Sequence, residues 1–480
     1  MLRGKTSVSG NISVRVEVLE WAVVVCAFVL SASYLAQSQE MPLESPMSTT
    51  VMFDSQDRIL ILAPHPDDEV LGNGGVIQET VRMKLPLRIV FLTYGDNNEW
   101  SFLVYRKHPV LLPKAVRGMG LVRYKEALEA AKILGVSPGQ LTFLGYPDFR
   151  TLEIWCSHWG DRPPAESMLT HVKAVPYPNA FRPGAPYKGE EILDELRAII
   201  REFRPTKIFV SHPADLHSDH KSLYLFLRVA LWDLGDEIDP AIYPYLVHYR
   251  HWPTPRGYHP EDILVPPQLF EQKTRWQSHN LNPVEIERKH DALEKHRSQY
   301  EADKTYLLSF VRSNEIFGDL PEIPLSSSAP AVQLSPGYDN FETEPPEQLL
   351  EQERAAFIGI QERSVRLENG RLVQSIRLSR PLGKQVGASV YVFGYRKDRS
   401  FQEMPKLQVK FGELEYKIYD QDRILPMDVA RVERRGEEIT IEIPLELLGN
   451  PEHILTSAHT YLLGLVPLDW VSWRILRISY

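Results

Sequence analysis

A histidine and three consecutive acids follow directly after an apolar run near the start of the chain, in the stretch ILILAPHPDDEVLGNGG (59–75). His65, Asp67, Asp68 and Glu69 are residue types that bind metal ions or transfer protons. Three adjacent carboxylates repel one another, so their clustering calls for a positive group close by. A bound cation would supply that charge.

A second polar loop, SHPADLHSDH (211–220), follows another apolar run. His217 and His220 stand three residues apart at an expected helix start, a spacing that places both side chains on one face. The two loops together offer the mixture of imidazole nitrogens and carboxylate oxygens that suits Zn²⁺ or another borderline divalent ion. A catalytic zinc needs three protein ligands and one open position, and this set can supply them. His212 and Asp215 belong to the same motif, and shaping the loop is an equal alternative for both.

Strands and helices that alternate along the chain must position these two loops. The apolar runs predict strands over 59–63, 87–94, 141–144 and 207–211, and amphipathic stretches predict helices over 69–83, 121–134, 190–203 and 219–231. This alternation is typical of an α/β fold with a Rossmann-like, mostly parallel sheet and flanking helices. Ligands of such sheets bind at the carboxyl ends of the strands, so both loops are expected at one edge.

Two long segments, 97–120 and 148–189, lack periodicity, and loops of that length are usually functional or disordered. The second contains five aromatic residues among many prolines: Trp155, Trp159, Tyr177, Phe181 and Tyr187. These rings either form stacking surfaces for sugars or pin the loop to the body of the protein.

The last third of the chain differs from the rest in its composition and in the period of its apolar residues. Residues 319–348 are rich in proline and serine and read as a linker. Beyond them the apolar pattern has a period of two, with a hairpin signal at Asn369-Gly370. We therefore expect a catalytic domain over 52–318 and a C-terminal β-sandwich domain over 349–480.

Composition narrows the function classes. The 480 residues carry a net charge of -9 without a long basic tract, which argues against a nucleic-acid partner. Basic residues precede an uncharged run over 21–36, a layout that predicts a signal peptide over 1–38, with an uncleaved membrane anchor as the alternative. Cys26 lies in that run and Cys156 stands alone after it, so a mature chain has no disulfide framework.

The motifs PHPDDEVLGNGG and HPADLHSDH together resemble those of the LmbE-like deacetylase family, which includes the N-acetylglucosaminyl-phosphatidylinositol de-N-acetylases. Supporting matches are LTYGDN (92–97), RYKEALEAAKILGV (123–136), LTFLGYPD (141–148) and KHDALEKHRSQY (289–300). The resemblance covers about residues 57–317. It implies a zinc-dependent hydrolase that removes N-acetyl groups, usually from glucosamine.

The resemblance also implies roles for individual residues. His65, Asp68 and His220 match the family's metal ligands. Asp67 matches the general base, which takes a proton from water, and His217 matches the histidine that stabilises the negatively charged carbonyl oxygen. Asp219 matches an acid that supports this histidine.

Other residues near the motifs have more than one interpretation. Arg123 stands where the family often places an arginine that contacts substrate. Asp96 and Asp148 end strands at the site edge and either bind sugar hydroxyls or hold turns. His296 either lines the pocket and contacts substrate or caps its helix, and Glu69 is expected to orient a neighbour rather than to bind the ion.

We therefore expect an exported zinc deacetylase, with Fe²⁺ as the alternative metal, acting on an N-acetylated sugar or glycan such as an N-acetylglucosamine glycoconjugate. A membrane contact is expected only through an uncleaved N-terminal segment, and the oligomeric state stays open. The alternatives are a hydrolase for a different acyl group and a non-catalytic glycan-binding protein. The aromatic insertions and the β domain lie outside the minimal family pattern, so the glycan itself is not predicted.

Overall fold

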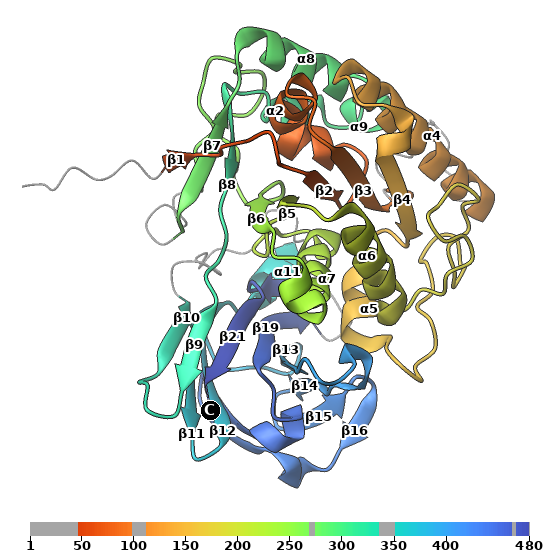
Figure 1. Ribbon diagram of the computed structural model, residues 1–480. Coiled ribbons are helices and arrows are strands. Elements are labelled where there is room, and N and C mark those ends of the chain that lie inside the picture. The colour runs from red at the N-terminus through yellow and green to blue at the C-terminus, as the bar shows by residue number, and fades with distance from the viewer. Residues whose placement is uncertain (1–46, 98–111, 268–273, 336–350, 463–466, 480) are drawn as a thin grey trace, which may run out of the picture. The chain divides into compact units, whose positions relative to one another are not determined.

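A five-stranded parallel sheet lies at the centre of the N-terminal part of the structure (Figure 1). The computed structural model describes residues 47–97, 112–267, 274–335, 351–462 and 467–479. The strand order is β4-β3-β2-β5-β6. The bounds are β2 (Ile59–Ala63), β3 (Leu87–Thr93), β4 (Leu141–Tyr146), β5 (Lys207–Ser211) and β6 (Ala241–Tyr245). The predicted parallel α/β sheet is confirmed.

The chain reverses its direction of travel across the sheet next to β2. From β2 it passes to β3 and β4 on one side, and it then returns to add β5 and β6 on the other. Ile59 pairs with both Leu87 and Lys207, so β2 has a parallel partner on each side. The carboxyl ends of β2 and β5 flank this switch point, where open α/β sheets form their ligand crevice.

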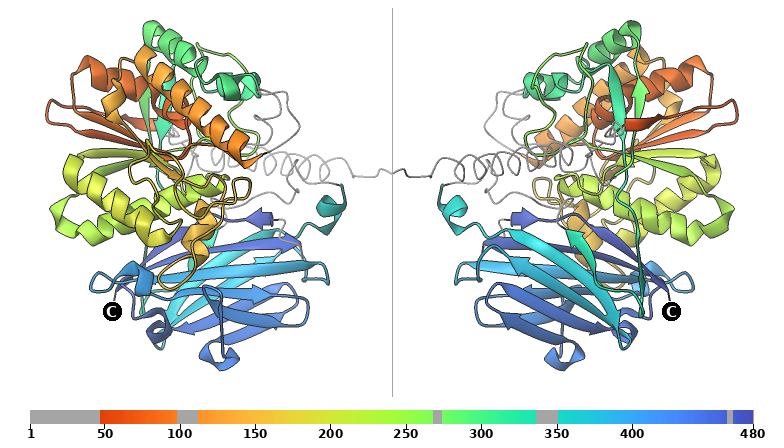
Figure 2. Two further views of the ribbon diagram at one scale, coloured as in Figure 1. Left: turned by 90° about the vertical axis from the view of Figure 1, so that its right-hand side faces the viewer. Right: turned by 90° about the vertical axis from the view of Figure 1, so that its left-hand side faces the viewer.

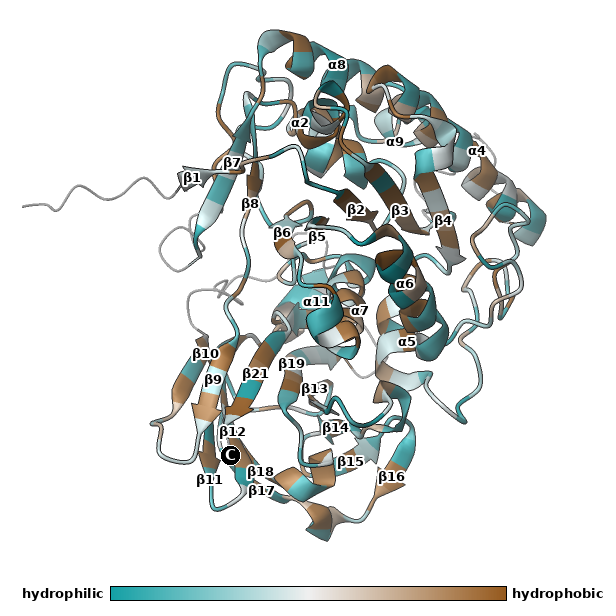
Figure 3. Cartoon of the chain, in the orientation of Figure 1, coloured by the Kyte–Doolittle hydropathy of each residue, from teal (hydrophilic) through white to brown (hydrophobic). Residues whose placement is uncertain are grey.

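Helices cover both faces of this sheet, with α2 and α4 on one face and α6 and α7 on the other (Figures 1 and 2). The sheet lies in an apolar layer, and β2 and β3 are hydrophobic almost throughout (Figure 3). The helices are α2 (Asp68–Arg82), α4 (Pro113–Ile133), α5 (Thr151–Ser157), α6 (Gly189–Phe203), α7 (Ser218–Leu234), α8 (Pro283–Leu293), α9 (Arg297–Tyr300) and α10 (Lys304–Leu308), with 3₁₀ turns η1 (Pro138–Gln140) and η2 (Gly235–Glu237).

Helix α4 begins eight residues before the predicted start at residue 121. Pro113 occupies its first position, where the missing N–H costs nothing. Gly118 and Gly120 hid this first part of the helix, because glycine is a poor helix former. At Gly120 a Cβ would lie 2.4 Å from the Tyr177 hydroxyl, so close packing explains the glycine.

A small second sheet has the order β1-β7-β8. Its strands are β1 (Met47–Thr50), β7 (Trp276–Asn280) and β8 (Asn314–Phe317). Strand β8 also carries Glu315, which accepts hydrogen bonds from the backbone of α2 at Gly75 and Val76. The small sheet thereby fixes the helix that follows the first motif.

The C-terminal part is a sandwich of two sheets, as predicted. One has the order β10-β11-β12-β18-β17 and the other β16-β15-β14-β13-β19-β21-β9, with β20 paired to β19. A shared apolar core lies between them. The strands are β9 (Ile323–Ser326), β10 (Val332–Ser335), β11 (Ile360–Glu368), β12 (Arg371–Leu378), β13 (Val386–Tyr395), β14 (Lys406–Phe411), β15 (Tyr416–Asp420), β16 (Arg423–Leu425), β17 (Arg431–Arg435), β18 (Glu438–Pro444), β19 (His453–Leu462), β20 (Pro467–Trp470) and β21 (Arg474–Ser479). Helix α11 (Glu351–Ala356) and the turns η4 (Phe401–Glu403), η5 (Met427–Val429) and η6 (Leu445–Leu448) complete this part.

The segment predicted as a linker, 319–348, contributes two strands to the sandwich. Strand β9 pairs in parallel with β21, and β10 pairs with β11. Leu325 and Leu334 are buried in the sandwich core. Proline and serine dominated the composition of this segment and masked its alternating apolar residues, so the sandwich begins before the predicted boundary at 349.

Aromatic side chains join the two domains. Trp155 of α5 packs against Phe401 and Trp473 of the sandwich, with ring centroids 5.2 and 6.2 Å apart. Trp159 packs against Phe401 at 5.0 Å. Both tryptophans are completely buried, so their rings pin the loop to the protein and offer no stacking surface to a sugar. Tyr177 and Tyr187 are buried as well, and Phe181 is partly buried against the same core.

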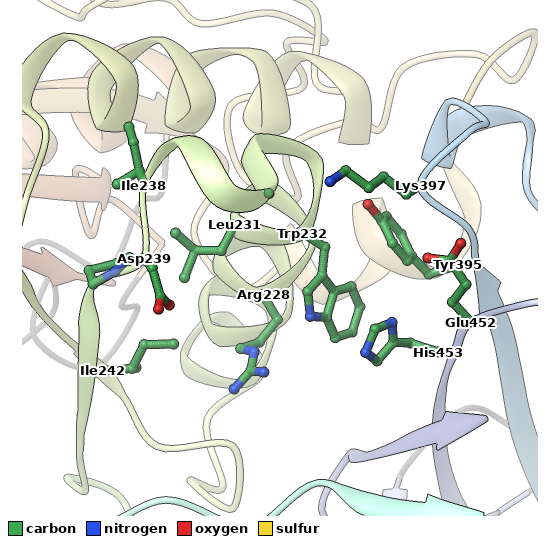
Figure 4. Close-up of a pocket in the computed structure, with 12 residues that line it drawn as sticks. Arg228, Leu231, Trp232, Ile238, Asp239, Ile242, Tyr395, Lys397, Glu452 and His453 are labelled. Carbon is green, nitrogen blue, oxygen red and sulfur yellow. The ribbon is translucent and has the colours of Figure 1, made fainter. Parts of the chain in front are cut away.

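A cavity of about 360 Å³ also lies between α7 and the sandwich (Figure 4). The Trp232 ring stacks on His453 at 4.2 Å and has the Arg228 guanidinium 5.7 Å from its centroid. Tyr395 donates a hydrogen bond to Asp233. The aromatic groups of this cavity are thus engaged in holding the domains together.

The predicted signal or anchor over 1–38 lies outside the described residues. Within the described part of the chain, no helix combines the length and the apolar character that crossing a bilayer requires.

Candidate active site

The two motif loops meet at the carboxyl ends of β2 and β5, as predicted. His65 lies two residues after β2, and α2 begins three residues later at Asp68. His217 is the residue before α7, and its Nδ1 accepts a hydrogen bond from the Asp219 backbone at 3.2 Å. The rings of His65 and His217 lie 4.6 Å apart, so the sheet brings both motifs into one site.

Asp68 links the three predicted metal ligands. One of its oxygens, Oδ2, lies 3.1 Å from His65 Nδ1 and 3.1 Å from His220 Nε2. All three residues are buried. Burial raises the pKa of Asp68, but His220 and His65 outweigh it and hold this pKa well below its usual range. An ionised carboxylate between two imidazoles fits a divalent cation.

Asp215 orients His220 from the far side of its ring. Asp215 Oδ2 lies 3.1 Å from His220 Nδ1, which leaves Nε2 directed at Asp68. Burial lowers the pKa of His220, but Asp215 and Asp68 raise it to about 9. A carboxylate on the outer nitrogen of a ligating histidine is a common way to fix its orientation. Asp215 therefore does more than shape the loop, whereas His212 stacks on Trp276 beneath the site.

Asp67 is held in a strained conformation beside the cluster. Its φ of 126° lies in the region that favours glycine, and such outliers gather at functional sites. Its backbone N–H donates to Glu69 at 2.8 Å, and its Oδ2 accepts from Arg123 at 3.3 Å. Burial raises the pKa of Asp67 to about 7, although Arg123 opposes this shift. A carboxylate with that pKa suits proton transfer near neutral pH.

The Asp219 carboxylate faces His65 and not the His217 side chain. It lies 3.1 Å from His65 Nε2 and accepts hydrogen bonds from the backbone of Phe149 and Thr151 at 2.7 and 3.2 Å. The predicted support of His217 by Asp219 runs through the Asp219 backbone N–H instead. The physical reason is the helix start, where the N–H two residues on points back at the capping side chain.

The three predicted substrate contacts are all buried. Arg123 donates to the carbonyls of Gly95 and Pro66 at 2.9 and 2.7 Å, and its side chain lies behind Asp67. Asp96 accepts a hydrogen bond from the Tyr177 hydroxyl at 2.5 Å.

His296 is fully enclosed, with Nε2 3.0 Å from Glu69 Oε1. Arg123, Asp96 and His296 thus fit positioning roles better than direct contact with substrate. Glu69 connects His296 to the Asp67 backbone, the orienting role expected for it.

The structure adds three residues to the site that no motif of the sequence indicates. Thr151 binds Asp219, and Phe149 places its ring 4.4 Å from that of His217. His248 follows β6 by three residues and lies beside His217 and His220. The rule that ligands gather at the carboxyl ends of parallel strands was the available signal for His248, because β6 is the neighbour of β5.

The comparisons with known proteins agree with the motif assignment. Residues 60–231 match the family described as GlcNAc-PI de-N-acetylase, PIG-L. This matched region contains both motif loops and every residue of the cluster from His65 to His220.

Two curated relatives are similar over this region. A 1D-myo-inositol 2-acetamido-2-deoxy-alpha-D-glucopyranoside deacetylase from Corynebacterium urealyticum is 27% identical over 38% of this chain and 51% of its own length. A probable N-acetyl-alpha-D-glucosaminyl L-malate deacetylase 2 from Bacillus anthracis is 29% identical over 35% of this chain and 73% of its own length. The chain spans about half the length of most of the curated relatives it matches.

Among solved structures, N,N'-diacetylchitobiose deacetylase from Pyrococcus horikoshii is 20% identical, with a TM-score of 0.32. The match covers 57% of this chain and 84% of that one.

Proposed function

We propose that this protein is a divalent-metal-dependent N-deacetylase that acts on an N-acetylglucosamine-type sugar or glycoconjugate. The observation that carries the proposal is the convergence of His65, Asp68 and His220 at the switch point of the sheet, with Asp67 beside them. The match of residues 60–231 to the PIG-L family and the names of the curated relatives support the choice of an N-acetyl sugar.

His65, Asp68 and His220 would hold the ion, and we propose Zn²⁺, with Fe²⁺ as the alternative. The buried carboxylates around them favour a cation: Asp67, Asp68, Asp148, Asp215 and Asp219. A bound divalent ion supplies Lewis-acid polarisation of the acetamide carbonyl and acidifies an attacking water.

The remaining steps belong to side chains of the chain itself. Asp67 is placed to take the proton of the attacking water and to return it to the leaving amine. His217 Nδ1 accepts from the Asp219 backbone, so a neutral His217 carries its proton on Nε2. That N–H can donate to the negative charge that develops on the carbonyl oxygen.

The deciding experiment measures acetate release by the full-length chain, loaded with Zn²⁺ or Fe²⁺, from a panel of N-acetylated sugars. We expect Asp67→Asn to lower kcat by a factor of about 10² to 10⁴ while the bound metal stays stoichiometric. The matched control is Asp161→Asn, because Asp161 is exposed and remote from the motifs in the sequence. Undiminished acetate release by Asp67→Asn, or none from any sugar by the metal-loaded wild type, would refute the proposal.

Exposed apolar side chains near the site favour a second candidate, a substrate with a longer acyl chain or an apolar aglycone. Phe149 beside His217 is 44% exposed and Leu216 is 41% exposed. Met168, whose sulfur lies 3.9 Å from the Asn97 amide nitrogen, is 50% exposed. Comparing release of acetate with release of longer acids from matched N-acyl glucosamines distinguishes the two candidates.

We also propose that the chain is exported, on the basis of the sequence pattern over 1–38 alone. An extracellular or envelope glycan would then be the accessible substrate. Cell fractionation with N-terminal sequencing of the mature protein tests this, and a cytoplasmic chain that keeps residue 1 would contradict it.

A further inference from the structure

His248 is a fourth histidine at the site, and the assignments by resemblance give it no role. It lies just beyond β6, with its ring 4.8 Å from the ring of His220 and 5.2 Å from that of His217. Asp68, His220 and His248 each offer one ligand atom, and these atoms lie within 4.8 Å of one another. His248 is only partly buried.

Tyr306 determines which nitrogen of His248 is available. The Tyr306 hydroxyl donates its hydrogen to the carbonyl of Val247 at 2.9 Å. Its oxygen lies 3.2 Å from His248 Nδ1, and because the hydroxyl hydrogen is already used, Nδ1 must be the donor in this contact. A neutral His248 therefore keeps a free electron pair on Nε2, the form in which histidine binds metals.

Asp215 connects His248 to His220, one of the predicted metal ligands. Its Oδ2 accepts the backbone N–H of His248 at 2.9 Å, and the same atom lies 3.1 Å from His220 Nδ1. One carboxylate oxygen thus places both histidines. This arrangement matches the outer partners that orient ligating histidines, with Tyr306 as the partner of His248 and Asp215 as that of His220.

We propose that His248 Nε2 is an additional ligand of the divalent ion held by Asp68 and His220. The inference rests on the metal site of the proposed function and not on its substrate. With His65, the side-chain ligands become three imidazoles and one carboxylate, a set that favours Zn²⁺ and other borderline ions over Mg²⁺ or Ca²⁺. Because four side-chain ligands usually close a zinc site, the proposed deacetylation would then require the ion to accept a fifth ligand when water or substrate binds.

The test titrates the metal-free, full-length chain with Co²⁺ in competition with a chelator and records its absorption spectrum. We expect His248→Gln to weaken Co²⁺ binding by at least about tenfold and to change the ligand-field bands. We expect Tyr306→Phe to weaken binding less, because Nε2 remains but its tautomer is no longer fixed. His220→Gln is the positive control and should lose most of the binding.

A substitution that replaces His248 with another metal-binding residue gives a direct spectroscopic signature. His248→Cys places a thiolate at this position, and ligation would produce a sulfur-to-cobalt charge-transfer band absent from the wild type. The matched control is His259→Cys, because His259 is a partly exposed histidine outside the clusters found among the described residues. Thermal unfolding of the metal-free variants establishes that they are folded, and Tyr306→Phe preserves the test if a His248 variant is not.

Each outcome decides the proposal. Wild-type affinity in His248→Gln, or no charge-transfer band in a folded His248→Cys that binds Co²⁺, would overturn it, and so would a wild type that binds no Co²⁺. A His248-dependent spectrum in a chain that releases no acetate would support the additional ligand and reject the deacetylase. Acetate release by a chain whose metal binding does not depend on His248 would support the deacetylase and reject the additional ligand.

Discussion

Arg123 holds Asp67 in position through three contacts of its guanidinium. The guanidinium reaches the carbonyls of Gly95 and Pro66 and the carboxylate of Asp67 at the same time. Gly95 permits this approach, because a Cβ there would lie 2.1 Å from Arg123 Nη1. The side chain thereby joins the loop after β3 to the strained turn before α2.

We expect Arg123→Lys to lower kcat of the proposed deacetylation by about tenfold or more and to leave KM unchanged. A single ammonium group cannot reproduce the fork that holds three acceptors, so Asp67 would lose its exact position. Steady-state kinetics on the best substrate of the panel measures both constants.

A rise in KM at constant kcat would point instead to the direct substrate contact predicted from the sequence. Arg117→Lys provides the comparison, because Arg117 lies on the same helix, six residues earlier.

At the scale of elements, the β11–β12 hairpin turns through two residues with positive φ. Asn369 has φ of 49° and Gly370 has φ of 72°, and Glu368 pairs with Arg371 across the turn. The hairpin predicted from the Asn-Gly signal is therefore present, with its turn at these two residues. A two-residue turn of this kind matches the twist of the strands that it joins.

We expect Gly370→Ala to lower the free energy of unfolding by about 1 kcal/mol. A Cβ at this position would meet nothing within 4 Å, so the backbone conformation alone carries the cost. The control is Gly383→Ala, which also has open space but no left-handed φ, and it should change stability by less than about 0.5 kcal/mol. Urea unfolding measures both variants, and equal effects would contradict the assignment of strain.

Lys406, at the start of β14, makes the stability of the contact between the domains depend on pH. Burial lowers its pKa from 10.5 to about 7, although Asp420 and Glu190 oppose this shift. Its Nζ donates to the Met404 carbonyl and lies 4.7 Å from the Trp159 ring centroid. The folded chain therefore holds fewer protons on this group than the unfolded chain between these two pKa values.

In that window the free energy of unfolding rises with pH, because the unfolded state binds more protons. We expect the stability of the wild type relative to Lys406→Met to increase from pH 7 towards 10.5. Urea unfolding of both proteins across this range measures the difference. A difference that stays constant with pH would contradict the low pKa of Lys406.

Four of the five strands of the catalytic sheet were predictable because they are mostly apolar runs followed by polar residues, whereas β6, which contains Pro244, was not predicted. The ligand set of His65, Asp68 and His220 came from the resemblance of the two motifs to a known family. The contacts that surround this cluster were not predictable. Arg123 and His296 depend on side-chain directions between elements far apart in the sequence, and His248 lies in no motif.

At the scale of the whole molecule, one apolar core includes the catalytic sheet and part of the sandwich. Tyr391, Phe393, Phe401 and Trp473 of the sandwich belong to the same core as β2 and β3. This contact is more hydrophobic than most contacts between two domains of one chain. Such domains are typically joined by more polar surfaces.

We therefore expect a chain that ends at residue 318 to expose Trp155 and Trp159 and to aggregate. Size-exclusion chromatography and binding of a hydrophobic dye, compared with the full-length chain, measure the effect. The full-length chain should unfold in one transition by both tryptophan fluorescence and circular dichroism. A monomeric truncated chain with undiminished acetate release would show that the sandwich is dispensable.

Helix α5 contacts both the active site and the sandwich, so it limits any attempt to replace the sandwich with another domain. Thr151 at its first position binds Asp219 in the active site, and Trp155, one turn later, is enclosed by Phe401 and Trp473 of the sandwich. A chimera that joins this catalytic domain to a foreign domain after residue 318 would lack the Phe401 and Trp473 rings that enclose Trp155. The catalytic domain must therefore be transferred together with the part of the sandwich that supplies these rings.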